Sequence, residues 1–237
     1  MNQSDETNKI FVVFASGLCG EFIISMLTGM RDPNEFDRLT VTHAGSCHLN
    51  RRDEPEVVCR NREKLEKLLQ EEEYPTWLVK AHINIEDSDL LLERYPNCKV
   101  IAMTQDHPRG YQGFSNFLWK AILAEWDKYG CESYNKLSGQ NVKLKTEINK
   151  AGIDALYKKF LDPAHYPIQT QAKMARFPGR YFTFPLDVLY NDRQGTIAML
   201  EYISGEKIND RAEAFYDEYL SKQPKKQFVL KYWDIIK

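Results

Sequence analysis

The sequence lacks both a strong excess of charge of one sign and a long hydrophobic run. Across its 237 residues, 32 lysines and arginines nearly balance 34 aspartates and glutamates, which gives a formal net charge of -2. So small a net charge creates no global field that attracts nucleic acid, so any basic site must be local. No segment has the uninterrupted apolar length that spans a bilayer. We therefore expect no membrane and no nucleic acid among the partners, and the sequence leaves the oligomeric state open.

Cysteine is too sparse and too scattered to form a disulfide framework. The five cysteines are odd in number and widely spaced, a pattern typical of reduced thiols in a cytosol-like compartment. The N-terminus, MNQSDETNK, is polar and lacks the hydrophobic core of a signal peptide. We therefore expect a cytoplasmic protein with a polar tail over residues 1–8 and a single domain over residues 9–237.

A complete Walker A motif is also missing, although the chain begins with the strand, turn and helix that such a motif needs. Ile10 to Phe14 is apolar and β-branched, and Ser16-Gly17 and Gly20 punctuate the segment after it. Apolar residues then recur at helical spacing: Phe22, Ile23, Met26 and Leu27. The free N–H groups at the start of such a helix bind anionic groups. The alternative is a tight strand-to-helix turn without a ligand.

The residues after Gly20 argue against nucleotide hydrolysis. A Walker A loop carries a lysine and a serine or threonine there, which reach the outer phosphates and ligate magnesium. This chain has Glu21 and Phe22 instead. The loop therefore favours phosphate binding and disfavours hydrolysis of ATP or GTP.

Further strands alternate with helices along the chain. Strand composition is found at Thr76 to His82, at Lys99 to Thr104 and at Arg180 to Phe184, with a last edge at Val188 to Tyr190. This alternation predicts a three-layer, P-loop-like α/β fold, in which helices flank a central parallel sheet of about five strands. Ligands of such sheets bind at the carboxyl ends of the strands, so the loops after Phe14, Val79 and Met103 should converge.

Helical spacing and capping residues predict the helices between and after these strands. They are a helix capped by Asn61, Glu86 to Arg94, Tyr111 to Tyr129, Ala151 to Leu161, Arg193 to Ile203, and one that Asn209 or Asp210 caps and that runs to about Leu220. Two segments are irregular. Arg31 to Asn61 is expected to be an excursion beside the site with one short strand near Leu39 to Thr42, and Gly130 to Lys150 a lid or insertion.

Three strand ends carry short polar motifs: Ala15 to Gly20, Lys80-Ala81-His82, and Gln105 to Arg109 followed by Ser115. In order and spacing these motifs resemble those of the sulfotransferase family, whose members bind 3′-phosphoadenosine 5′-phosphosulfate on a P-loop-like fold. The family motifs are a Pro-Lys-Ser-Gly-Thr-Thr-Trp run, Lys-Thr-His, and Arg-Asp-Pro with a later serine. The segment YFTFPLDVLY and the helix after it are also similar to the end of that fold. The resemblance covers most of the chain outside the two irregular segments.

The resemblance implies sulfuryl transfer from 3′-phosphoadenosine 5′-phosphosulfate to a hydroxyl or amine of a small-molecule, glycan or peptide acceptor. His82 would take the acceptor proton, and Lys80, on the same face of the strand, would stabilise the leaving oxygen. The 5′-phosphate would be bound by Ser16, Gly17, Leu18, Cys19, Gly20 and Glu21. Gln105, Arg109 and Ser115 would lie near the 3′-phosphate. No metal is required, and the positive charge must come from side chains and helix dipoles.

Two departures from the family motifs remove charge from the site. Ala15 replaces the lysine that stabilises the leaving phosphate, and Gln105 replaces an arginine, although Arg109 is a candidate substitute. These departures favour a rival hypothesis, a catalytically decayed nucleotide-binding or interaction module. A P-loop kinase is a third, weaker reading. Lys80 and His82 can also be read as residues that merely edge an exposed strand, and Ser115 as a packing residue.

One irregular segment holds side chains of the types that bind metals: His43, Cys47, His48 and Cys59. Its spacing is not a standard zinc pattern, because a second paired cysteine is missing. The sequence therefore predicts no metal site.

Overall fold

A five-stranded sheet with all strands parallel forms the centre of the protein. The computed structural model describes residues 8–14, 19–41, 47–49, 56–59, 61–74, 76–104, 135, 139–149, 151–152, 166–185, 188–189 and 192–221. The strand order is β4-β5-β1-β6-β7. These strands are β1 (Ile10–Val13), β4 (Glu56–Cys59), β5 (Leu78–Ile83), β6 (Lys99–Thr104) and β7 (Tyr181–Pro185). The predicted α/β class with a central parallel sheet is thus confirmed.

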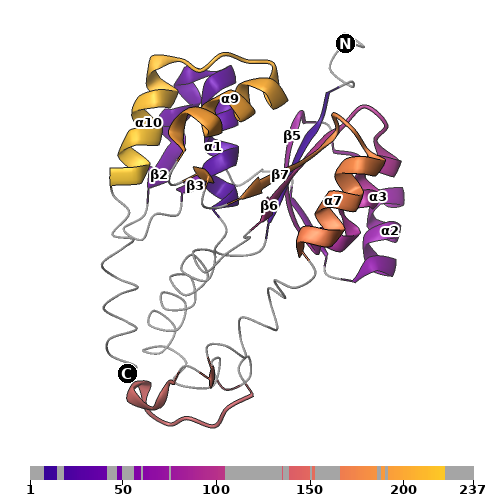
Figure 1. Ribbon diagram of the computed structural model, residues 1–237, viewed down its shortest axis with the longest axis vertical. Coiled ribbons are helices and arrows are strands. Elements are labelled where there is room, and N and C mark those ends of the chain that lie inside the picture. Colours follow the sequence, from indigo (N-terminus) through magenta and orange to yellow (C-terminus); the bar gives the residue numbers. More distant parts are fainter. Residues whose placement is uncertain are drawn as a thin grey trace.

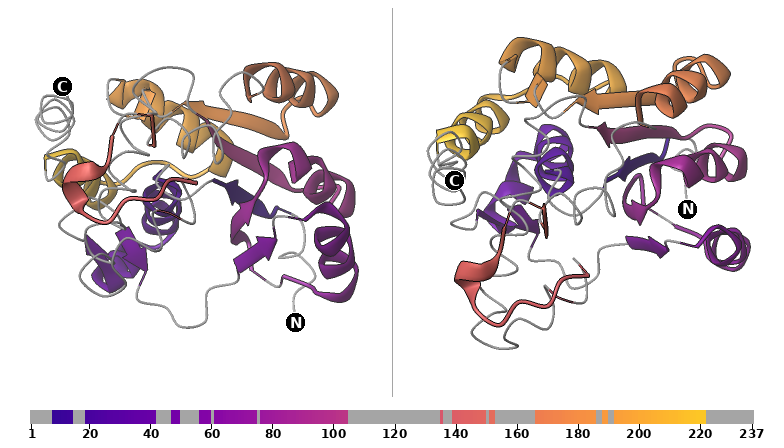
Figure 2. Two further views of the ribbon diagram at one scale, coloured as in Figure 1. Left: turned by 90° about the horizontal axis from the view of Figure 1, so that it is seen from below. Right: turned by 60° about the horizontal axis from the view of Figure 1, so that its bottom comes forward.

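Helices cover both faces of the sheet (Figure 1). One face carries α1 (Gly20–Arg31), α9 (Arg193–Ser204) and α10 (Asp210–Ser221). The other carries α2 (Arg62–Glu71), α3 (Asp89–Arg94) and α7 (Tyr166–Arg176). The turned views in Figure 2 show the same three layers. Right-handed crossovers explain why α1 lies on the face opposite to α2, α3 and α7, because the connection from β1 to β4 runs across the sheet in the direction opposite to the later ones.

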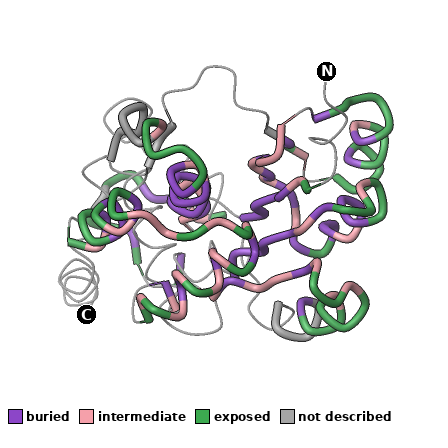
Figure 3. Tube along the Cα trace, turned by 90° about the horizontal axis from the view of Figure 1, so that it is seen from above, coloured by how far each residue is buried: buried purple, intermediate pink, exposed green. Residues whose placement is uncertain are grey.

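Side-chain alternation along the strands gives each face its own core. On the α1 face, Ile10, Val12 and Phe14 pack against α1, α9 and α10. On the other face, Phe11 and Val13 pack against α2 and α3. Because β1 lies in the middle of the sheet, it is buried on both sides, and its sequence is a continuous apolar run. Figure 3 shows this burial along the strands and α1, with exposed residues on the outer helices.

The aromatic ring of Phe22 joins α1 to α10. Phe22 is fully buried, and its ring stacks on Tyr219 with 4.0 Å between ring centroids. The rings of Phe215 and Tyr216 lie at 5.7 and 5.4 Å from the same ring. At the far end of α1, the amide of Asn209 donates to the carbonyl oxygen of Gly29. The two helices are therefore antiparallel, and the C-terminal end of α10 lies beside the N-terminus of α1.

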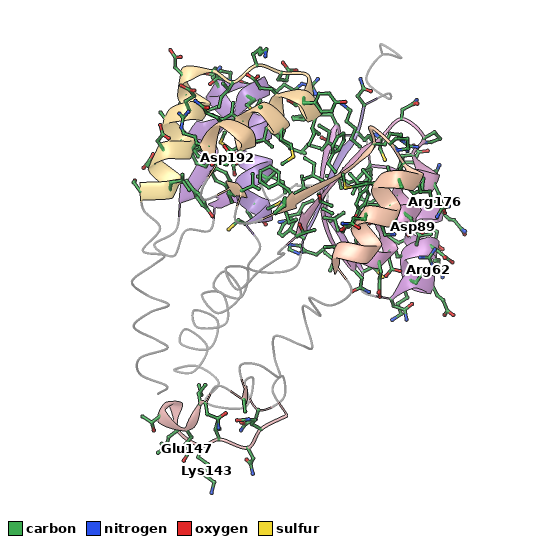
Figure 4. All side chains as sticks on the ribbon, viewed as in Figure 1. Arg62, Asp89, Lys143, Glu147, Arg176 and Asp192 are labelled. Carbon is green, nitrogen blue, oxygen red and sulfur yellow. The ribbon has the colours of Figure 1, made fainter. Side chains whose placement is uncertain are left out.

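An ion-pair cluster centred on Asp89 ties α2, α3 and α7 together on the opposite face. The Asp89 carboxylate is 3.3 Å from Lys173 Nζ, 3.4 Å from Arg62 Nη1 and 3.7 Å from Arg176 Nη1. Figure 4 shows Asp89 with Arg62 and Arg176 on this side of the sheet. Burial alone would raise the pKa of Asp89, but Lys173 and Arg62 outweigh it and lower the pKa. The charged form of Asp89 therefore stabilises the folded state.

This cluster predicts a specific acid sensitivity. The folded pKa of Asp89 lies below its unfolded value, so its stabilisation is present above about pH 4 and is lost as the pH falls through the folded pKa. We expect Asp89→Asn to lower the free energy of unfolding by about 1–2 kcal/mol at pH 7 and to lose less stability than the wild type between pH 5 and 3. Urea denaturation across that pH range measures both effects. The exposed Asp210→Asn is the control, and equal pH profiles of wild type and Asp89→Asn would contradict the prediction.

Most predicted elements on the described ranges are confirmed. The first strand and helix correspond to β1 and α1, and Lys99–Thr104 is β6 with the predicted bounds. Asn61 caps α2, since its side chain accepts a hydrogen bond from Lys64 N. Asn209 likewise caps α10 by accepting from Ala212 N. The predicted helix from Glu86 is a 3-10 turn, η2 (Ile85–Ser88), that continues into α3.

The segment from Arg31 to Asn61 contributes more to the fold than an excursion. It begins with a 3-10 helix, η1 (Pro33–Arg38), and forms a two-stranded antiparallel sheet from β2 (Leu39–Val41) and β3 (Cys47–Leu49). The short strand near Leu39 is therefore confirmed. The segment from Arg31 to Asn61 also supplies β4, an edge strand of the main sheet, which the sequence prediction missed. A four-residue strand between charged residues has too little apolar periodicity to be recognised.

One prediction next to β7 is wrong, and one helix before β7 was missed. Val188 and Leu189 are helical rather than the edge of a strand. Leu189 is fully buried, and its carbonyl oxygen accepts a hydrogen bond from the Tyr216 hydroxyl, so its apolar character reflects packing against α10. No helix was predicted at α7, which carries Pro167 at its second position, where proline is tolerated in the first turn of a helix. The predicted helix Tyr111 to Tyr129 lies outside the described residues, as does Ala151 to Leu161 apart from residues 151–152, which are helical.

Candidate functional site

The junction between β1 and α1 brings a strand end and a helix N-terminus together at the carboxyl edge of the sheet. Phe14 follows β1, and Cys19 precedes α1 with left-handed backbone angles of φ 58 and ψ 23. A Cβ atom added to Gly20 would lie 2.1 Å from the Phe14 ring, so only glycine fits at the first position of the helix. This close contact explains the glycine that the sequence places before the helix.

Lys80 of β5 reaches this helix N-terminus. Lys80 Nζ lies 3.0 Å from Glu21 Oε1, and the two side chains are only 16% and 17% exposed. The pair forms because β5 lies next to β1, with Lys80 in register with Val12, so that Lys80 projects on the α1 face. A positive charge is thus held next to the N–H groups at the start of α1, but a carboxylate in the first turn already binds it.

The second carboxylate oxygen of Glu21 has an unusual environment. Glu21 Oε2 is buried and has no hydrogen-bond partner in the described part of the chain. A buried acceptor without a donor is costly, and such atoms are rare in folded proteins. The first turn of α1 therefore carries an acceptor that has room for one more donor.

His82 lies two residues beyond Lys80 on the same face of β5. Its imidazole ring packs against Phe14, with 4.3 Å between ring centroids. Val58 of the edge strand β4 is its register partner on the other side. The site thus has a histidine and a lysine on one strand, both directed to the face that α1 covers.

Tyr219 of α10 completes the junction from the other side. Its hydroxyl donates to Cys19 Sγ at 3.1 Å, and its ring is fully buried on Phe22. Cys19 begins the helix without a capping hydrogen bond from its own side chain. The contact from α10 therefore helps to hold the turn that leads into α1.

The structure brings five of the predicted site residues together: Cys19, Gly20, Glu21, Lys80 and His82. The other predicted site residues lie outside the described part of the chain: Ser16, Gly17, Leu18, Gln105, Arg109 and Ser115. Thr104, which directly precedes Gln105, ends β6 at the same edge of the sheet. Its hydroxyl is buried and has no hydrogen-bond partner within the described ranges. The convergence of the ends of β1 and β5 is confirmed.

Two residues of this region were not singled out from the sequence. Phe14 was read as core, but its ring also packs on His82 and fills the space above Gly20. The phenylalanine immediately before the glycine-bearing loop was the available signal. Tyr219 had no such signal, because its partner Cys19 is 200 positions away in the sequence.

The described cysteines and possible metal ligands can also be compared with the sequence predictions. In the described part of the structure, Cys19, Cys59 and Cys98 do not form disulfide bonds. Burial raises the pKa of Cys98 to about 11, which makes this thiol inert.

Over the described ranges, no three histidine, cysteine, aspartate or glutamate side chains gather as metal ligands do. In those ranges, too, no helix combines the length and apolar character needed to cross a membrane.

Comparisons with known proteins find similarity to solved structures but not to protein-family models or curated sequences. No protein-family model matches the chain, and no curated protein matches it. Among solved structures, a sulfotransferase from Mycobacterium tuberculosis is similar with a TM-score of 0.42 and 11% sequence identity. The match covers 97% of this chain and 76% of that one.

Proposed function

We propose that the protein binds 3′-phosphoadenosine 5′-phosphosulfate at the junction of β1 and α1 and transfers its sulfuryl group to a hydroxyl or amine of an acceptor. The observation that carries the proposal is the placement of Lys80 and His82. Both project from β5 on the face that α1 covers, and Lys80 reaches the first turn of α1. An anion at a helix N-terminus gains from the free N–H groups and from the helix dipole.

The proposed transfer assigns one role to each of these groups. His82 accepts the proton of the acceptor hydroxyl as the oxygen attacks sulfur, and the new O–S bond forms. The bond from sulfur to the bridging oxygen breaks in line, and its electron pair remains on that oxygen of 3′-phosphoadenosine 5′-phosphate. Lys80 stabilises this developing charge together with the N–H groups of the helix.

The ion pair between Lys80 and Glu21 favours a second candidate function. A lysine held by a carboxylate at 3.0 Å contributes less charge to a leaving group than a free one. Ala15 and Gln105 remove two further charges that the resembling family has. The second candidate is therefore a module on the same fold that binds the nucleotide without transfer.

Thermal stability in the presence of ligands tests the proposal. A ligand that binds only the folded state raises the melting temperature, by an amount that corresponds to about 2.7 kcal/mol at 100 times its dissociation constant. We expect a rise with 3′-phosphoadenosine 5′-phosphate and none with ATP and magnesium. No response to the first nucleotide would contradict the proposal, and a response to ATP alone would favour a kinase. Binding without turnover over a panel of acceptors would favour the module.

A further inference from the structure

We propose that Glu21 sets the anion affinity of this site by holding Lys80 in an ion pair that an incoming phosphate group must open. The inference rests on the proposed function, which places an anion at the N-terminus of α1. Lys80 reaches the first turn of α1, where its ammonium group is 3.0 Å from Glu21 Oε1. The Glu21 carboxylate is thus already paired with the ammonium group that a phosphate would bind.

The environment of the pair makes this competition strong. Both side chains are more than four-fifths buried, so water screens their attraction less than it screens a surface pair. Glu21 also lies in the first turn of α1, where the helix dipole favours negative charge. Glu21 is therefore bound by the same two attractions, lysine and helix, that favour a bound phosphate.

The free oxygen of the same carboxylate shows that the arrangement is not fully satisfied. Glu21 Oε2 is buried without a hydrogen-bond partner in the described part of the structure. Rotation of the Glu21 side chain toward water would satisfy this oxygen and release Lys80 at the same time. The pair is thus suited to open when an anion arrives, and the apparent affinity of the site equals its intrinsic affinity multiplied by the fraction of molecules in which the pair is open.

Three variants, compared with the wild type, separate this role from simple charge repulsion. Glu21→Gln keeps the shape of the side chain and removes the negative charge that faces Lys80, so it should tighten binding of 3′-phosphoadenosine 5′-phosphate about tenfold, within the usual range of coupled sites. In the Lys80→Met background, the same change should have little effect, because no lysine remains to be released. Lys80→Met alone and the double variant complete the cycle. The double variant carries no unpaired charge, which guards against misfolding.

The control is Glu63→Gln, which removes the same charge from the first turn of α2. It should leave the affinity unchanged. Titration calorimetry with 3′-phosphoadenosine 5′-phosphate, and separately with inorganic sulfate and inorganic phosphate, measures each dissociation constant. Melting temperatures of all variants show whether each one is folded.

The possible outcomes distinguish this inference from the proposed function. Wild-type affinity in Glu21→Gln, or equal tightening with and without Lys80, would overturn the role of the ion pair and leave nucleotide binding intact. If only the inorganic anions bind, and they bind more tightly to Glu21→Gln through Lys80, the nucleotide proposal fails and the ion-pair inference holds. If no variant binds any of the three anions, both are overturned.

Discussion

His82→Ala is expected to reduce sulfuryl transfer by about 10²–10⁴-fold in kcat, the usual contribution of a general base. The physical reason is that no other group on the α1 face of β5 can accept a proton near neutral pH: the neighbouring Lys80 is an ammonium group. Nucleotide binding should change little, since the proposed phosphate contacts come from the loop, the helix and Lys80. Steady-state rates and calorimetric titration with 3′-phosphoadenosine 5′-phosphate measure the two effects separately.

A second variant separates proton transfer from packing. The imidazole of His82 lies 4.3 Å from the Phe14 ring, so alanine also removes a ring contact beside Gly20. His82→Phe keeps an aromatic ring against Phe14 and removes the base. We expect it to be as inactive as His82→Ala while its melting temperature stays closer to that of the wild type. Turnover at the wild-type rate in either variant would remove His82 as the base.

Phe22→Ala is expected to destabilise the protein by about 3–5 kcal/mol, the range for truncation of a buried phenylalanine. Phe22 is fully buried, and its ring is enclosed by Phe215, Tyr216 and Tyr219 of α10. Removal of this ring leaves a cavity between α1 and α10 that rigid helices fill poorly. Urea denaturation, read from the midpoint at an unchanged m-value, gives the loss.

Phe182→Ala is the matched control for this prediction. Phe182 lies on β7 at the edge of the sheet, is only partly buried and packs edge to face on the exposed Tyr202. Its truncation removes less buried surface, so the loss should be clearly smaller. Equal losses for the two variants would contradict the central role of Phe22. Phe22→Ala, unlike Phe182→Ala, should also affect the turn before α1, because Tyr219 both stacks on Phe22 and donates a hydrogen bond to Cys19.

The sequence predicted the central sheet well because its strands leave strong local signals. The run Ile10 to Val13 is apolar throughout, as a strand buried on both faces requires, and Lys99 to Thr104 repeats that pattern. Asn61 and Asn209 mark helix starts through the hydrogen bonds that their side chains accept. Such features depend on residues a few positions apart, so they can be read without the fold.

The site was predictable only where its contacts follow from the topology. Lys80 and His82 share one face of β5 because strand side chains alternate, and β5 lies next to β1. The ion pair with Glu21 depends on how far two long side chains reach across 59 positions of sequence, which no local pattern encodes. The Tyr219 contact depends on the antiparallel packing of α10 on α1 in the same way. The sequence thus predicted the face on which Lys80 lies but not its ion pair with Glu21.

The central claim is that an anion binds at the N-terminus of α1, beside Lys80. Backbone amide resonances of the protein, followed during titration with 3′-phosphoadenosine 5′-phosphate, test it most directly. The account predicts that the largest shift changes fall on the residues from Cys19 to Phe22 and from Lys80 to His82, and that they saturate together. Saturable changes confined to other elements, or no changes at all, would contradict it.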